Sequence, residues 1–305
     1  MLDSRLHIRI VSPSGAIDPV YMDNACARLR EWGFAVSEGR YARNKAGRFA
    51  GTDEERLADL NEAMQDPSVD WVLCSRGGYG LQRIIDRIGT MNKPVIGFSD
   101  ITCLHALAFR QGMPSLHAPM CKHIAIWNEN APSLQLLRRT LQPAQAGDAL
   151  AYTIPPHPLN RIGKVHSTLI GGNLSVLYGL QGTPYGLTAL LAEQKEKPVL
   201  FIEDIAERHY HIDRMMNNLR LSGVFERIGG LMVGQFTDCA DDPAMGCSVM
   251  QTIREAVKNY NFPILFGFPA GHGDCNYPLW FGGRCVLDVQ SDGALIATAL
   301  PQQNA

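Results

Sequence analysis

Short apolar runs alternate with amphipathic stretches throughout the first half of this chain of 305 residues. Four such runs are predicted strands because they are short and rich in β-branched or aromatic residues; they lie at residues 8–11, 34–37, 71–74 and 95–98. The amphipathic stretches predict helices at 19–31, from Thr52 onward, at 81–88 and after Ser99. Because strands that alternate with helices form a parallel sheet covered on both faces, we predict an α/β fold for this half.

A proline-containing stretch separates the two halves of the chain. The segment 143–164 includes Pro155 and Pro156 and has few periodic apolar positions, which is typical of a linker. We therefore expect one domain at 1–142 and a second at 165–305.

The second half again alternates predicted strands and helices. Strands are expected at 168–173, 199–202, 231–233 and 264–266, and helices at 174–179, 213–221 and 249–260. The last part of the chain, at 285–289 and 295–299, has the alternating pattern of an antiparallel hairpin.

Charge and cysteine content narrow the class of protein. The formal net charge is −2 and no cluster of lysine and arginine stands out, so we expect no nucleic-acid partner and no membrane partner. The eight cysteines form no C-x-x-C pair, which favours reduced thiols over disulfides or a zinc site. The N-terminal segment lacks the long apolar run of a signal peptide, which predicts a cytoplasmic protein.

Ser99 lies where a predicted strand turns abruptly into a helix. The apolar run 95–98 precedes it, and an apolar helical pattern follows it until Gly112. This position exposes the hydroxyl at the positive end of a helix dipole, where N–H groups can stabilise an oxyanion. Ser99 is therefore a candidate nucleophile, although the motif is not the usual G-x-S-x-G, and Ser99 or Asp100 could simply cap the helix.

The turn Arg76-Gly77-Gly78-Tyr79-Gly80 directly follows another predicted strand. Consecutive glycines let backbone N–H groups approach a ligand closely and can form an anion-binding nest. Three interpretations stay open: a phosphate cradle, one half of an oxyanion hole, and a plain tight turn. The spacing does not match a dinucleotide-binding fingerprint, and the chain has no Walker A sequence.

A serine nucleophile needs a general base and a group that orients this base. Among nine histidines, His272 is the strongest candidate, since it lies between glycines in a loop after the predicted strand 264–266. Glu203 follows the predicted strand 199–202 and is the candidate to orient the histidine. The adjacent Asp204 can cap a helix instead.

Three other histidines have simpler interpretations. His105 is expected inside the helix after Ser99, whereas His209 and His211 are expected at a solvated helix entry. A structural role is the more common one for any single histidine.

Four motifs together resemble the LD-carboxypeptidases of peptidoglycan recycling, a family of serine peptidases with a Ser-Glu-His triad. They occur in the family's order along nearly the whole chain: Arg76-Gly77-Gly78-Tyr79-Gly80, Gly97-Phe98-Ser99-Asp100-Ile101-Thr102, Ile202-Glu203-Asp204 and Gly267-Phe268-Pro269-Ala270-Gly271-His272. The resemblance implies a flavodoxin-like N-terminal domain with a parallel sheet and a smaller, swivelling β/α C-terminal domain. It also implies a homodimer.

The resemblance further implies a role for each motif. Ser99 would be the nucleophile, His272 the general base and acid, and Glu203 the residue that holds His272 in its productive tautomer. The oxyanion hole would consist of the N–H of Asp100 and one N–H from Gly77 or Gly78. Asp100 would also cap the helix that follows. Neither a metal nor a cofactor is implied.

The implied substrate is a murein tetrapeptide, from which the enzyme releases the terminal D-alanine. We assign the free carboxylate of this substrate to Arg76, because a guanidinium pairs bidentately with a carboxylate, and expect Tyr79 to contact the substrate too. A structural salt bridge is the alternative role of Arg76.

Two other functions stay open. Microcin C immunity peptidases share the Ser-Glu-His set but act on peptidyl nucleotides, and their glycine loop differs. A non-catalytic flavodoxin-like protein could use Ser99 and the glycine turn to bind an anion.

Overall fold

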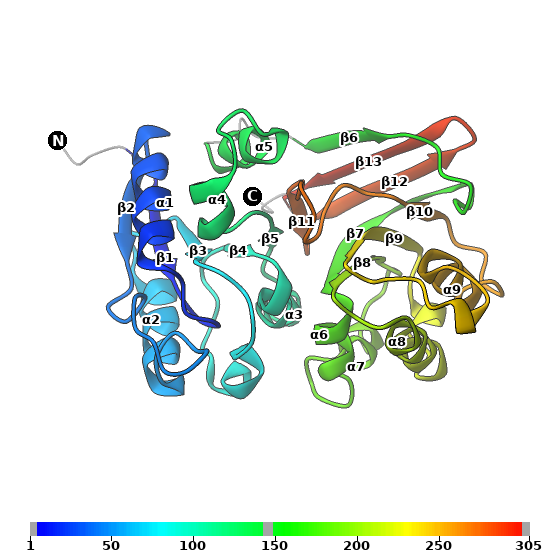
Figure 1. The fold of residues 1–305 in the computed structure, drawn as a ribbon, viewed down its shortest axis with the longest axis horizontal. Helices are drawn as coiled ribbons and strands as arrows, with labels where there is room; N and C mark the ends of the chain where they lie inside the picture. Colours follow the sequence, from blue (N-terminus) through cyan, green and yellow to red (C-terminus); the bar gives the residue numbers. More distant parts are fainter. Residues whose placement is uncertain (1–4, 143–148, 301–305) are drawn as a thin grey trace. The chain divides into compact units, whose positions relative to one another are not determined.

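A computed structural model describes residues 5–142 and 149–300 and divides the chain into two units (Figure 1). The first unit comprises residues 5–142 together with Tyr277–Leu279, and the second comprises the other described residues. The α/β prediction is confirmed for the first unit, and the second is also a mixed α/β unit.

A six-stranded sheet contains five strands of the first unit and one strand that begins at Leu279 and continues into residues of the second unit. In spatial order its strands are β11 (Leu279–Phe281), β5 (Ser115–His117), β4 (Val95–Gly97), β3 (Trp71–Cys74), β1 (His7–Val11) and β2 (Ala35–Glu38). The pairs from β2 through β5 are all parallel. The predicted parallel sheet is therefore confirmed, and β3 and β4 end just before the turn Arg76–Gly80 and before Ser99.

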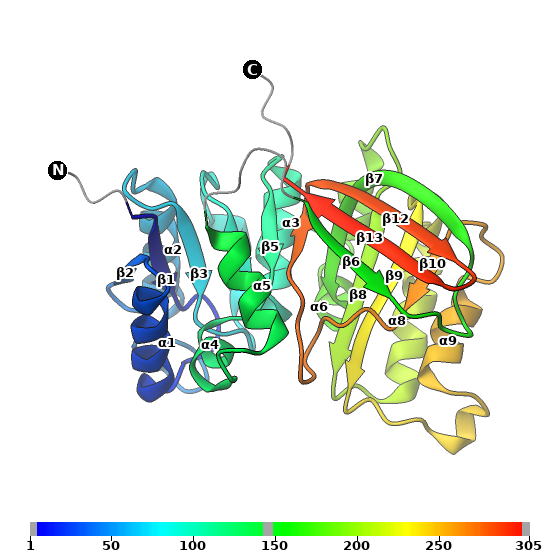
Figure 2. The same cartoon turned by 90° about the horizontal axis from the view of Figure 1, so that it is seen from above.

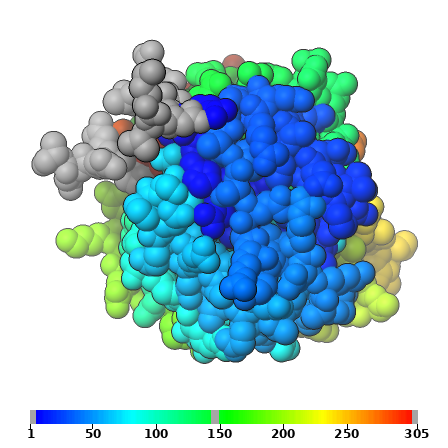
Figure 3. All heavy atoms as spheres, turned by 90° about the vertical axis from the view of Figure 1, so that its left-hand side faces the viewer, coloured from blue at the N-terminus to red at the C-terminus, as the bar shows by residue number. Residues whose placement is uncertain are grey.

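Helices flank this sheet on both faces (Figure 2). They are α1 (Pro19–Glu31), α2 (Asp53–Gln65), α3 (Thr102–Arg110), α4 (Cys121–Ile126) and α5 (Pro132–Leu141). Asp18 caps α1 just before a proline at its first position, and Thr52 and Glu55 form the predicted capping box of α2. The face shown in Figure 3 is built mainly from the blue segments that hold β1, α1, β2 and α2.

The prediction of one continuous helix at 81–88 is wrong. The structure has two single 3₁₀ turns there, η1 (Leu81–Arg83) and η2 (Ile85–Arg87). Ile84 lies between them with φ −129° and ψ −5°, which is outside the helical region and interrupts the hydrogen-bond ladder. A third 3₁₀ turn, η3 (Ser99–Ile101), leads into α3.

The second unit has a seven-stranded mixed sheet. Its order is β10 (Ile264–Phe266), β9 (Gly230–Thr237), β8 (Val199–Ile205), β7 (Gly163–Asn173), β12 (Arg284–Gln290), β13 (Gly293–Ala299) and β6 (Leu150–Ile154). Pairs from β10 to β7 are parallel and pairs from β7 to β6 are antiparallel. The predicted C-terminal hairpin is confirmed as β12 and β13.

Four helices belong to this unit: α6 (Leu174–Gly179), α7 (Leu187–Ala192), α8 (His209–Leu221) and α9 (Val249–Ala256). Two more 3₁₀ turns are η4 (Phe225–Arg227) and η5 (Pro243–Met245). The expected solvated helix entry is wrong for His209, which is buried and bonds Thr252 Oγ1 at 2.7 Å, so that it joins α8 to α9.

The predicted linker 143–164 is wrong in part. Residues 143–148 lie outside the described part of the chain, but Leu150, Tyr152 and Ile154 alternate as buried residues of β6, which pairs with β13. The second unit thus begins before the prolines, and its edge strand precedes them.

All eight cysteines have free thiols, as predicted. Across residues 5–142 and 149–300, no helix is long and apolar enough to cross a membrane.

Candidate functional site

Ser99 lies at the junction that the sequence predicted. Phe98 continues the extended backbone beyond β4, Ser99 then adopts φ 67°, and the chain enters η3 and α3. A positive φ is uncommon for a residue with a side chain and costs about 1–3 kcal/mol, so surrounding contacts must hold it. The contacts that do so come from the glycine turn.

Gly77 is the neighbour that fits against Ser99. A Cβ built on Gly77 would lie 2.7 Å from Ser99 Cβ, 2.9 Å from its Oγ and 3.2 Å from the backbone nitrogen of Asp100. Only glycine leaves room for this approach. The structure therefore brings together Ser99, Gly77 and the Asp100 amide.

The turn is also fixed on its other side. The N–H of Gly15 donates to the carbonyl of Gly77 at 3.1 Å. Because the peptide unit is planar and trans, the N–H of Gly78 in the same unit points away from Gly15.

The side chain of Asp100 does not cap the helix, contrary to the expectation. Its Oδ2 accepts hydrogen bonds from Ser14 Oγ at 2.7 Å and from the N–H of Leu81 at 3.0 Å, while η3 and α3 have no side-chain cap among the described residues. Burial raises the pKa of this carboxyl group. Through these two bonds Asp100, the residue after Ser99, links the turn after β1 to the segment that follows the turn after β3.

Arg56 is a second buried group that sequence reasoning missed. It is fully buried in α2, donates to the carbonyl of Pro13 at 2.6 Å and pairs with Asp53. Its guanidinium lies 5.3 Å from the ring centroid of Phe49. A charged residue on the buried face of an amphipathic helix leaves no periodicity signal that could have identified this contact.

In the second unit, His272 and Glu203 form a hydrogen-bonded pair. Nδ1 of His272 lies 2.7 Å from Oε2 of Glu203, which is fully buried on β8. Because a carboxylate only accepts hydrogen bonds, Nδ1 carries the hydrogen and Nε2 is the basic nitrogen of the neutral ring. The structure thus confirms the proximity of these two residues, which are 69 positions apart.

The loop that carries His272 is held on both sides. Gly271 has φ 140°, and a Cβ on it would lie 3.1 Å from Glu203 Oε2. The N–H of Gly273 donates to Oε1 of Gln235 at 2.9 Å. These contacts place the ring against the carboxylate without a bulky neighbour.

Asp204 was expected to cap a helix, but it does not cap α8, the helix that follows it in the chain. It accepts hydrogen bonds from Asn173 Nδ2 at 2.9 Å and from the N–H of Ser175 at 2.8 Å, so it binds the first turn of α6. The helix after β8, α8, follows Arg208 instead. Burial, and then the charge of Glu203, raise the pKa of Asp204 to about 7.

His105 has the structural role expected for a helix interior. Its Nδ1 bonds Ser115 Oγ at 2.8 Å and its Nε2 bonds the carbonyl of Gly97 at 3.0 Å. Burial lowers the pKa of its ring to about 4. The ring is therefore neutral near pH 7, with Nε2 donating to Gly97 and Nδ1 accepting from Ser115.

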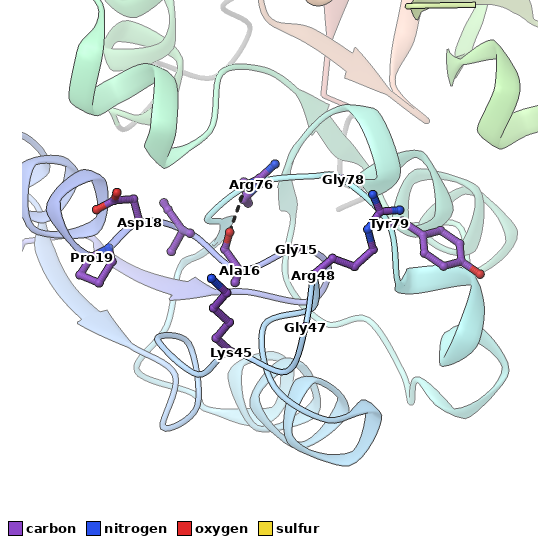
Figure 4. Close-up of a pocket in the computed structure, with 11 residues that line it drawn as sticks. Gly15, Ala16, Asp18, Pro19, Lys45, Gly47, Arg48, Arg76, Gly78 and Tyr79 are labelled. Atoms are coloured by element: carbon purple, nitrogen blue, oxygen red, sulfur yellow. Dashed lines mark hydrogen bonds between the residues drawn. The ribbon is translucent and has the colours of Figure 1, made fainter.

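The two predicted substrate-binding residues are exposed beside a cavity of about 550 Å³ (Figure 4). Arg76 Nη1 donates to the carbonyl of Ala16 at 3.1 Å, and the ring of Tyr79 lies 5.9 Å from that of Phe49. The cavity is lined by residues 15–19, Lys45, Gly47, Arg48, Arg76, Gly78 and Tyr79. The alternative of a structural salt bridge for Arg76 finds no support among the described residues, since none of the ion pairs there includes it.

The predicted site residues therefore form two clusters, one in each unit. The first offers a hydroxyl beside backbone amides, and the second offers an imidazole oriented by a carboxylate. Within the described ranges there is no group of histidine, cysteine and acidic side chains arranged to hold a metal ion.

Comparisons with known proteins identify the family of this chain. The family model of the LD-carboxypeptidase N-terminal domain matches residues 8–118, and that of the C-terminal domain matches 166–287. A probable murein peptide carboxypeptidase of Bacillus subtilis is 32% identical, over 97% of this chain and 92% of the relative. The murein tetrapeptide carboxypeptidase of Pseudomonas aeruginosa is 29% identical, over 92% of each chain.

A solved structure and a second kind of relative extend the comparison. The crystal structure of muramoyltetrapeptide carboxypeptidase from Oxalobacter formigenes matches with a TM-score of 0.84 and 25% identity, over 97% of this chain and 100% of that chain. The microcin self-immunity protein MccF of Escherichia coli is 25% identical, over 86% of this chain and 84% of the relative.

Proposed function

This chain belongs to the LD-carboxypeptidase family, and we propose that it is a serine peptidase that releases the terminal D-alanine of murein tetrapeptides. Names of relatives at about 30% identity support the substrate class. The observation that carries the proposal is the 2.7 Å hydrogen bond from His272 to buried Glu203, because it gives the chain an oriented general base.

Ser99 is the proposed nucleophile. The left-handed backbone at this residue and the glycine opposite it set the hydroxyl beside the Asp100 amide. In this proposal the N–H of Asp100, with one from Gly77 or Gly78, stabilises the oxyanion. Each such donor contributes about 3–4 kcal/mol to the transition state.

The proposed reaction proceeds through an acyl-enzyme. Nε2 of His272 takes the proton of Ser99 as the serine oxygen attacks the carbonyl carbon before the D-alanine. The same nitrogen then gives this proton to the departing amine, so the C–N bond breaks and D-alanine leaves. Water, deprotonated by His272, hydrolyses the ester and restores Ser99.

Arg76 is the proposed partner of the C-terminal carboxylate, with Tyr79 beside it. Its guanidinium is exposed, next to the glycine turn, and it donates a hydrogen bond to the neutral carbonyl of Ala16. A planar guanidinium can add a bidentate pair with a carboxylate. Arg76→Ala should therefore raise KM for the tetrapeptide more than it lowers kcat.

The direct test is release of D-alanine from murein tetrapeptide. Wild-type protein should release it, while Ser99→Ala, Glu203→Ala and His272→Ala should each abolish release and leave the protein folded, as checked by circular dichroism. Ser68→Ala and His166→Ala, which change exposed residues of the same types, should keep full activity. A fully active variant at any of the three proposed positions would disprove the triad.

The same assay separates the other two functions. Turnover of an aminoacyl nucleotide, but not of tetrapeptide, would indicate a function like that of the microcin immunity relatives. Tight anion binding without turnover of either substrate would indicate a binding protein. The glycine turn favours the muropeptide peptidase over the immunity function, since Tyr79 and Gly80 occupy positions where the loop of the immunity peptidases differs.

A homodimer and a cytoplasmic location complete the proposal. Light scattering of the purified protein and fractionation of the cells that produce it test these two points.

A further inference from the structure

The cavity beside the glycine turn carries more positive charge than the proposed reaction uses. Lys45 and Arg48 come from the loop between β2 and α2, and Arg76 comes from the turn after β3 (Figure 4). We call these three residues the cavity cations. The proposed function assigns a partner to Arg76 alone, which leaves the other two without a role.

The protein does not neutralise this charge. No cavity cation forms an ion pair with another residue in the part of the chain that the structure describes. Arg43 on the same loop, in contrast, pairs with Glu38 at 2.6 Å and with Asp23 at 2.7 Å. The acid at the cavity, Asp18, accepts the N–H of Val20 at the start of α1. The cavity therefore keeps a net positive charge.

The cavity lies close to the groups that would bind the scissile carbonyl. Gly78 and Gly15 line it, Gly15 donates a hydrogen bond to Gly77, and Gly77 faces Ser99. A peptide bound at Ser99 therefore has the cavity on the other side of the glycine turn, next to its reacting carbonyl.

We propose that this cavity binds a second carboxylate of the substrate, located on the acyl side of the scissile bond. The inference rests on the proposed function. The leaving group, D-alanine, has one carboxylate, which Arg76 binds in that proposal, so the anion for Lys45 and Arg48 must belong to the acyl part. An ammonium and a guanidinium together suit a carboxylate. The substrate class is therefore an acidic peptide that ends in D-alanine.

Two matched tetrapeptides test the inference. Both end in D-alanine, and they differ only in one acyl-side carboxylate, which is free in one and converted to an amide in the other. Wild-type protein should show a kcat/KM for the free acid roughly tenfold above that for the amide. The double variant Lys45→Met/Arg48→Met should bring this ratio close to one, with an unchanged unfolding temperature.

Two further variants serve as controls. Arg40→Met removes a charge from the same loop outside the cavity and should keep the wild-type ratio. Lys45→Arg keeps the charge and should keep most of the preference. Equal cleavage of both peptides by wild-type protein, or an unchanged ratio in the double variant, would overturn the subsite.

Failure of the proposed function gives a different result. In that case wild-type protein releases D-alanine from neither peptide. Calorimetric binding of the two peptides then tests the subsite by itself: tighter binding of the free acid that the double variant loses supports it, and equal binding overturns it.

Discussion

Gly77 faces Ser99 so closely that a Cβ at position 77 would lie 2.7 Å from the Ser99 Cβ. We therefore expect Gly77→Ala to displace Ser99 from its left-handed conformation and to lower kcat by about 100-fold or more. Release of D-alanine measures this loss. Gly89→Ala is the matched control, because its Cβ would make only an ordinary 3.6 Å contact with Asn61. Wild-type activity in Gly77→Ala would contradict the packing argument.

Glu203→Gln keeps the shape of the side chain that holds His272 but removes its charge. The neutral amide stabilises the imidazolium of the transition state less, so kcat should fall by roughly 10³-fold with little change in stability. Release of D-alanine at a fixed pH measures this loss. Glu207→Gln offers a matched control, because Glu207 binds His211 at 3.0 Å on the more exposed start of α8. Equal activity losses in both variants would show that Glu203 has no special role.

Asp100→Asn should lower both stability and activity. The amide oxygen of asparagine can still accept from Ser14 and Leu81, but a neutral oxygen accepts more weakly than a carboxylate, and the amide nitrogen adds donors in a buried place. The expected loss is about 1–3 kcal/mol in the free energy of unfolding, measured with urea. The exposed Asp86→Asn should leave stability unchanged. A fully stable and active Asp100→Asn would show that these bonds do not hold the turns.

His105 should make the protein less stable in acid. The unfolded chain binds a proton at this ring below about pH 6.5, whereas the folded chain does so only below about pH 4, so protons favour unfolding between these values. The ring should account for a loss of about 3 kcal/mol as the pH falls from 6.5 to 4. His105→Gln should flatten this part of the stability profile, whereas the exposed His166→Gln should not. The same pH dependence in wild type and His105→Gln would contradict the assignment.

Local signals explain what the sequence predicted well. Helix α1 was predicted with the observed bounds because its amphipathic pattern starts at Pro19 and Gly33 follows its end; the structure adds Asp18 as its N-cap. Helix α6 was predicted equally well from the apolar stretch after Asn173, which proves to be its N-cap. Such signals depend only on neighbours in the chain.

The predictions were wrong where contacts between residues far apart in the sequence determine the local structure. The alternation of Leu150, Tyr152 and Ile154 was a strand signal, but the nearby prolines suggested a linker, and the partner strand β13 lies far along the chain. Asp100 and Asp204 both looked like helix caps, yet each accepts hydrogen bonds from segments far away in sequence. The hydrogen-bond partners of a buried acidic side chain produce no periodic pattern in the sequence from which they could be predicted.

In the candidate site, too, features that depend on local sequence were predicted and features that depend on distant contacts were not. The turn geometry of Ser99 and the glycine run were visible as strand-end motifs, and the hydrogen bond between His272 and Glu203 was expected from their positions after two strands. The charged cavity was not expected, because the basic loop that holds Lys45 and Arg48 is brought to the glycine turn only by the fold.

The return of residues 277–279 to the first unit has a consequence for any attempt to dissect the protein. A gene fragment that stops at residue 142 lacks β11, so the β5 edge of the six-stranded sheet loses its covering strand. Unpaired edge strands promote association between copies. We therefore expect the N-terminal fragment to aggregate on expression, whereas a chain that keeps residues 277–281 retains the strand that pairs with β5.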